Sequence, residues 1–117
     1  MKENKLLDLS KAFAADIIRL DETLKKRGKA NAIISQLLRS GTSIGANIHE
    51  ANYAQSRADF ASKLQIALKE CYETNYWLEL FKDTSIITQD EYDTMIAACN
   101  KIHRLLLASI KTTKENS

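Results

Sequence analysis

The sequence predicts an all-α protein: a single-domain, antiparallel four-helix bundle with up-down-up-down connections. Three observations lead to this fold class. The 117 residues include no proline and only three glycines, so little interrupts long helices. Apolar residues recur at spacings of three and four in four successive stretches, which is the period of amphipathic helices. The breaks are short, which favours antiparallel neighbours. The patterns place helices at roughly 4–27, 30–54, 57–83 and 89–111 within one domain, 1–117.

The first stretch has one apolar stripe and ends at a glycine. Its stripe consists of Leu6, Leu9, Phe13, Ile17, Leu20 and Leu24. Gly28 is a suitable C-terminal stop, and the cations Lys25, Lys26 and Arg27 before it suit the negative end of a helix dipole.

The second stretch is poor in charge. Its apolar positions alternate spacings of four and three, as in a coiled-coil seam: Ala30, Ile34, Leu37, Gly41, Ile44, Ile48 and Ala51. Between residues 30 and 55 only Arg39 and Glu50 are charged. A surface helix normally shows water a charged face, so we expect burial on more than one side and therefore self-association. Gly41 and Gly45 indicate either close helix approach or a local kink.

The third and fourth stretches begin at capping signals. Ser56 with Asp59 is a variant capping box, and Thr88 with Glu91 is a full one. The stripes that follow are Phe60, Leu64, Ala67, Cys71 and Leu78, then Tyr92, Met95, Cys99, Ile102, Leu106 and Ile110. Both cysteines lie in these stripes, so we interpret them as buried free thiols; a disulfide or a metal pair is the alternative. The polar tail from Lys111 to Ser117 is expected to fray.

Composition bears on several function classes. The net charge of +2 is too small to indicate nucleic-acid binding by itself. No run of 18 apolar residues is present, so we expect no membrane contact, and the charged N-terminal segment does not resemble a signal peptide. We therefore expect a cytoplasmic protein. His49 and His103 lack the Glu-x-x-His pairing of bundle metal sites, so we expect no enzyme activity, metal or cofactor.

Five polar residues of the second stretch fall on one edge beside the apolar stripe. They are Arg39, Ser40, Ser43, Asn47 and Glu50, which lie within about 100° of one another on a helical wheel. Arg39 and Glu50 are about 16 Å apart along the axis, so each needs partners on another helix or another subunit. The favoured interpretation is a buried network that fixes register and assembly. A recognition edge for an anionic ligand or nucleic acid is the alternative, and catalysis is the least favoured.

The segment 37–50, LLRSGTSIGANIHE, resembles the RSxxSIxxNIxE signature of the four-helix-bundle family of 23S rRNA intervening-sequence proteins. The similarity continues through Asp59-Phe60 and the run 66–70 and covers essentially the whole chain. It implies a homopentameric barrel without enzyme activity. The family also resembles accessory variability determinant proteins of diversity-generating retroelements, for which it implies nucleic-acid binding and association with a reverse transcriptase. This chain departs from the pattern at Gly45, where many members have proline, and at Ala51, where they have glycine.

Two functional hypotheses follow for a protein of this kind. In the first, the basic cluster of Lys25, Lys26, Arg27 and Lys29 binds RNA or DNA and is repeated once per subunit in a ring. The alternative for this cluster is a solvated loop. Many family members have a basic stretch after the signature, whereas residues 52–57 of this chain contain one cation, Arg57. In the second hypothesis, the off-stripe residues Ile66, Tyr76, Trp77 and Leu80 dock another protein. Burial in the core or in a self-assembly interface is the alternative for these residues.

Overall fold

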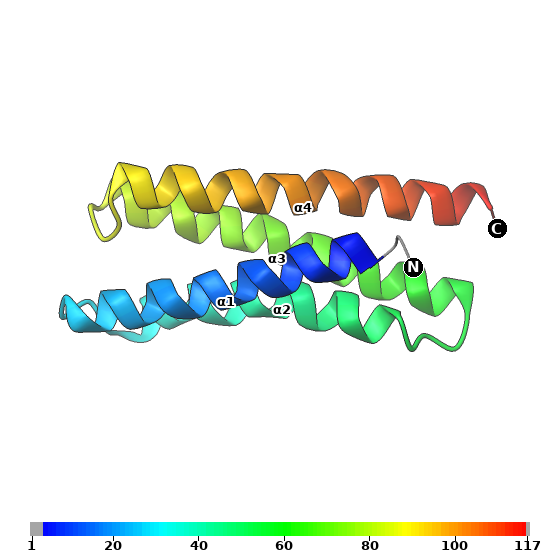
Figure 1. Cartoon of the computed structure of the whole chain (residues 1–117), viewed down its shortest axis with the longest axis horizontal. Helices are drawn as coiled ribbons and strands as arrows, with labels where there is room; N and C mark the ends of the chain where they lie inside the picture. The colour runs from blue at the N-terminus through cyan, green and yellow to red at the C-terminus, as the bar shows by residue number, and fades with distance from the viewer. Residues whose placement is uncertain (1–3, 117) are drawn as a thin grey trace.

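The computed structural model describes residues 4–116 and contains four α-helices in this range. They are α1 (Asn4–Lys26), α2 (Ala32–Ala51), α3 (Arg57–Asp83) and α4 (Gln89–Glu115). Each helix runs antiparallel to the one before it, and the bundle measures 48 × 22 × 20 Å (Figure 1). The described residues include no strand, so the all-α bundle predicted from the sequence is confirmed.

The start of α2 is set by an asparagine. The Asn31 side chain accepts hydrogen bonds from the backbone N–H groups of Ile33 and Ile34, at 2.9 and 3.0 Å. An N-cap of this kind satisfies donors that lack an intrahelical partner, so the helix begins at Ala32 and not at residue 30. Ala30 is exposed outside the helix, which differs from its predicted place in the apolar stripe. The helix also ends at Ala51, earlier than the predicted 54.

Both predicted capping signals are present. The Ser56 hydroxyl accepts from the Asp59 N–H at 3.0 Å. Thr88 and Glu91 form a complete capping box, with each side chain bonded to the other residue's backbone N–H. The C-terminal tail differs from the prediction, because α4 remains helical through Glu115. No glycine or proline interrupts it there, so polar residues simply continue the helix.

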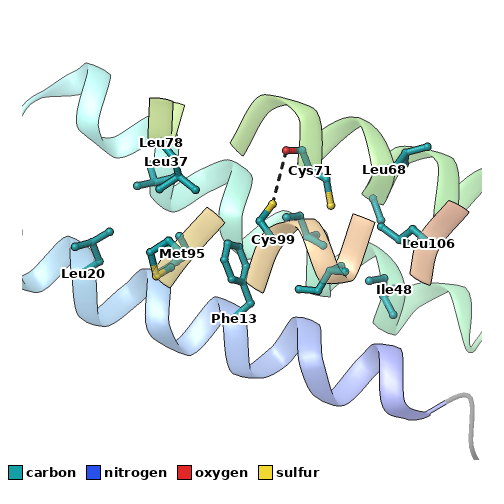
Figure 2. Close-up of a cluster of buried hydrophobic side chains, with 14 of the residues drawn as sticks. Phe13, Leu20, Leu37, Ile48, Leu68, Cys71, Leu78, Met95, Cys99 and Leu106 are labelled. Atoms are coloured by element: carbon teal, nitrogen blue, oxygen red, sulfur yellow. Dashed lines mark hydrogen bonds between the residues drawn. The ribbon is translucent and has the colours of Figure 1, made fainter. Parts of the chain in front are cut away.

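The four apolar stripes meet in one core. α2 packs along α1 and α3, and α3 packs along α4, so the helices follow chain order around the bundle. Phe13 of α1, Leu37 of α2, Leu78 of α3 and Met95 of α4 all belong to this core (Figure 2).

The two cysteines are buried in the same core. Both thiols are free, as predicted, and the Cys99 Sγ lies 3.9 Å from the Cys71 carbonyl oxygen (Figure 2). The thiol of Cys99 and burial together raise the pKa of the Cys71 thiol above its ordinary value. Both cysteines therefore act as small core side chains.

The mid-helix glycines of α2 allow α1 to approach closely. A Cβ at Gly41 would lie 2.8 Å from Cγ1 of Ile17, and a Cβ at Gly45 would lie 3.2 Å from the backbone oxygen of Ser10. α2 is one uninterrupted helix through both positions. Of the two interpretations of these glycines, close helix approach is therefore the one that the structure supports.

Candidate functional site

Ser40 is the buried member of the predicted polar edge. Its Oγ accepts a 2.9 Å hydrogen bond from the hydroxyl of Thr74 on α3, and both residues are completely buried. Two hydroxyls that face each other in an apolar core satisfy one another, whereas a register shift would leave both unpaired. The pair therefore fixes how α2 and α3 align.

Arg39 finds its partners on α3 of the same chain. Its guanidinium pairs with the carboxylates of Glu70, at 3.3 Å, and of Glu73. The Trp77 indole N–H also donates to Glu73, at 3.0 Å. The hydrogen bond from Arg39, followed by the one from Trp77, holds the pKa of Glu73 below its ordinary value.

The rest of the polar edge does not extend this network. Ser43 donates to the Arg39 carbonyl and Asn47 to the Ser43 carbonyl, so both side chains bond back to their own helix. Glu50 is exposed and pairs with Lys63 of α3 at 3.0 Å. The five residues therefore do not form one buried network, because Arg39 and Glu50 are exposed and pair with half-buried side chains of α3.

With its two charges drawn toward α3, the outer side of α2 carries no formal charge. We define the α1–α2 face as the residues Leu7, Ala14 and Ile18 of α1 together with Leu38, Thr42, Ala46, His49 and the following Tyr53. They recur at helical spacing along the outer sides of both helices. Ile18 is 47% exposed and Tyr53 is 75% exposed. The side of α2 that the sequence predicts to be buried is thus open in the single chain.

A groove runs between the two helices on this face. Its volume is about 430 Å³, and Gly45 and Ala46 line it from the α2 side. Asp8 and Lys11 line it from the α1 side. Because Gly45 and Ala46 are small, α2 contributes little side-chain bulk to this groove.

The basic cluster at the end of α1 is half neutralised. Arg27 donates two hydrogen bonds to the carboxylate of Glu91, at 3.0 and 2.7 Å, and Lys25 pairs with Asp21 at 2.9 Å. The Arg27 hydrogen bonds hold the pKa of Glu91 below its ordinary value. Lys26 and Lys29 are exposed, and neither has an ion-pair partner within residues 4–116.

The predicted second apolar surface is divided by the structure. Trp77 and Leu80 are half-buried and pack against the core. Ile66 and Tyr76 stay on the surface. Only Ile66 and Tyr76 are therefore exposed enough to contact another protein.

The two histidines lie beside aromatic rings. The ring centroids of His49 and Tyr53 are 5.4 Å apart, and those of His103 and Tyr72 are 4.9 Å apart. In the described part of the chain, no three metal-binding side chains gather at one point. None of the helices in that part is long and apolar enough to cross a membrane.

A second basic region was missed by the sequence analysis. From Thr94 to Lys114, α4 contains four cations and no acidic residue: Lys101, Arg104, Lys111 and Lys114. None of them forms an ion pair within residues 4–116. The absence of acidic residues over six helical turns was the available signal, and the dispersed spacing of the cations concealed it.

These features define a class of protein, the all-α antiparallel four-helix bundle whose second helix carries the Arg-Ser-Asn-Glu edge. Residues 2–108 match the model of the 23S rRNA-intervening sequence protein family, and the chain belongs to that family. A solved structure of a protein of unknown function, from the S23 ribosomal protein family of Bacteroides thetaiotaomicron, is 49% identical in sequence. The match covers 91% of this chain and 98% of that chain, with a TM-score of 0.88. A search of curated proteins finds no match.

Proposed function

We propose that this protein is a non-enzymatic bundle protein that assembles with copies of itself through the α1–α2 face and binds nucleic acid. The observation that carries the proposal is the open, uncharged outer side of α2. Both formal charges of this helix are paired with α3, so no charge on α2 opposes a second copy.

A second copy of the chain is the occupant that best suits this face. Removing exposed apolar side chains such as Ile18 from water favours association. The adjoining groove is lined on the α2 side by the small residues Gly45 and Ala46, which favours close approach of another helix. The resemblance described above implies five copies, arranged as a ring.

The non-enzymatic part of the proposal has a separate basis. It is the expectation from the sequence, where His49 and His103 lack the Glu-x-x-His pairing of a bundle metal site. The matched family and the similar solved structure carry no reaction in their descriptions.

Nucleic-acid binding is supported by unpaired cations and by the family to which the chain belongs. Lys26 and Lys29 would be repeated in every copy of a ring, which raises the local positive potential. The matched family is described by its link to an intervening sequence of 23S rRNA. The alternative is a scaffold that binds another protein, for which Ile66 and Tyr76 are the exposed apolar residues.

The assembly can be tested with one pair of matched variants. Ala46 lies in the α1–α2 face, whereas Ala97 is an exposed alanine of α4. Light scattering coupled to size-exclusion chromatography should show that Ala46→Glu dissociates the oligomer and that Ala97→Glu leaves its mass unchanged. Equal masses for both variants and the wild type would contradict the assignment of the face.

Nucleic-acid binding needs its own experiment. RNA binding by the wild-type chain should be measurable by fluorescence anisotropy at low salt and should weaken as salt rises. Failure to bind any RNA or DNA at low salt would remove this part of the proposal and favour the protein scaffold.

A further inference from the structure

We propose that the outer face of α3 and α4 binds single-stranded nucleic acid, with Tyr72 and Tyr76 stacking on bases and Arg104 and Lys111 contacting phosphates. This inference rests on the nucleic-acid binding proposed above and does not depend on self-assembly. It places the main contact surface on α3 and α4 and not on the loop that follows α1.

Two tyrosines on α3 offer their rings to solvent. Tyr72 is 54% exposed and Tyr76 is 58% exposed. They are four residues apart on one helix, so they lie on the same side and about 6 Å apart along the axis. Large aromatic side chains that stay exposed beside cations are the usual platforms for unpaired bases.

One contact between α3 and α4 fixes where the cations of α4 lie relative to these rings. Tyr72 packs edge-on against the ring of His103, with centroids 4.9 Å apart. Arg104 is the next residue along α4. Leu107, which is 45% exposed, and Lys111 follow at helical spacing on the same outer side. Arg104 and Lys111 are about 10.5 Å apart along α4 and can contact separate phosphates of one strand.

The charges along this face favour an anion at one end. No acidic residue lies on α4 between Asp93 and Glu115. On α3, the carboxylates of Glu70 and Glu73 are turned toward α2 and are paired with Arg39. Exposed Glu79, three residues after Tyr76 on α3, and Asp93 of α4 oppose polyanion binding at the other end of the face, so the strand is expected to follow the end with Arg104 and Lys111.

The seam between the two helices is also polar at this level. The Asn75 amide donates to the Asn100 side chain at 3.5 Å, a long hydrogen bond. The Asn75 Oδ1 and the His103 Nε2 are enclosed and have no hydrogen-bond partner in the described structure. Enclosed polar atoms without partners are uncommon in proteins, and one of these two belongs to His103, whose ring contacts Tyr72.

Single strands fit this face better than duplexes do. The tyrosine rings need exposed base faces, and these are covered by stacking inside a duplex. In contrast, the loop cations Lys26 and Lys29 have no exposed aromatic neighbour in sequence, so they could contribute charge but no stacking. The α3–α4 pair lies on the side of the bundle opposite α1 and α2, so assembly through the α1–α2 face leaves it accessible (Figure 1).

The test uses anisotropy of the full chain with a fluorescein-labelled oligouridylate and with an RNA duplex of equal length. Tyr72→Ala should weaken oligouridylate binding about tenfold, Tyr72→Phe should retain it, and the salt slope should not change. Arg104→Gln and Lys111→Gln should each reduce the salt slope by about 0.7. Lys26→Gln combined with Lys29→Gln, the loop variant, should weaken binding less than Arg104→Gln combined with Lys111→Gln does. Lys5→Gln, at an exposed cation of α1 outside both basic regions, is the matched control and should bind as the wild type does. Circular dichroism of each variant verifies folding.

Each contrary result is distinguishable. If the wild type binds RNA but only the loop variant weakens binding, the α3–α4 site is wrong and the proposed nucleic-acid binding stands. Preference for the duplex would overturn the single-strand inference alone. If the wild type binds neither RNA at low salt, both the inference and the proposed nucleic-acid binding are wrong.

Discussion

The close approach of α1 and α2 makes Gly41 a sensitive test of the packing. A Cβ added there would meet three atoms of Ile17, at 2.8, 3.0 and 3.1 Å. Ile17 is completely buried and β-branched, so it cannot rotate away cheaply. Replacing glycine by alanine in a helix gains about 1 kcal/mol of propensity, whereas overpacking of a core costs about 1–3 kcal/mol. Gly41→Ala should therefore lower the free energy of unfolding by about 1 kcal/mol.

A double-mutant cycle isolates the steric part of this effect. Ile17→Ala alone should destabilise by about 2–5 kcal/mol because it leaves a cavity. In that background the added Cβ has room, so Gly41→Ala should become stabilising by about 1 kcal/mol. The resulting coupling energy is about 2 kcal/mol.

Gly28 supplies a control that does not depend on packing. Its φ of 76° is in the left-handed region, and no atom lies within 4 Å of a Cβ built there. Gly28→Ala should cost about 1–2 kcal/mol in either background. Urea unfolding, followed by circular dichroism at a fixed protein concentration, measures all of these variants. Stabilisation of the wild type by Gly41→Ala, or a coupling energy below about 0.5 kcal/mol, would refute the reasoning.

Three further predictions concern the capping box, pH and the thiols. Thr88→Ala should lower the unfolding free energy by about 1 kcal/mol, measured in urea, because α4 loses its N-cap; unchanged stability would contradict the capping role. Arg27 holds the pKa of Glu91 below its ordinary 4.5, so this contribution to stability is complete above that value and is lost as pH falls through the lower, folded pKa. Arg27→Gln should therefore make the urea midpoint less sensitive to acid, and identical pH profiles would exclude the pair. Cys71 and Cys99 should resist iodoacetamide in the folded protein and react after denaturation; rapid native labelling would show that the core opens.

Much of the fold was predictable because its signals are local. The apolar stripes follow helical spacing, and the capping box of Thr88 and Glu91 involves neighbours in the chain. The start of α2 could also have been predicted from the sequence, since asparagine, here Asn31, is a favoured N-cap residue. Ala30, however, fits the apolar spacing of the stripe, so the pattern placed the start of the helix before Asn31.

The partners of the charged residues were not predictable in the same way. Arg27 pairs with a residue 64 positions away, and Arg39 pairs with α3. Such pairs depend on how each helix is rotated about its axis, which a helical pattern leaves undetermined to within a large angle. For the same reason, the sequence could not show that Tyr72 and Arg104 lie on adjacent outer sides of the bundle.

The central claim is that the uncharged outer side of α2 is an interface between copies of this chain. The most direct test is the molar mass of the untagged protein, measured by light scattering during size-exclusion chromatography. We predict a mass of at least twice 13.2 kDa, with five copies expected from the family resemblance. A mass of 13.2 kDa across the concentrations measured would mean that the open α1–α2 face is not a self-assembly interface.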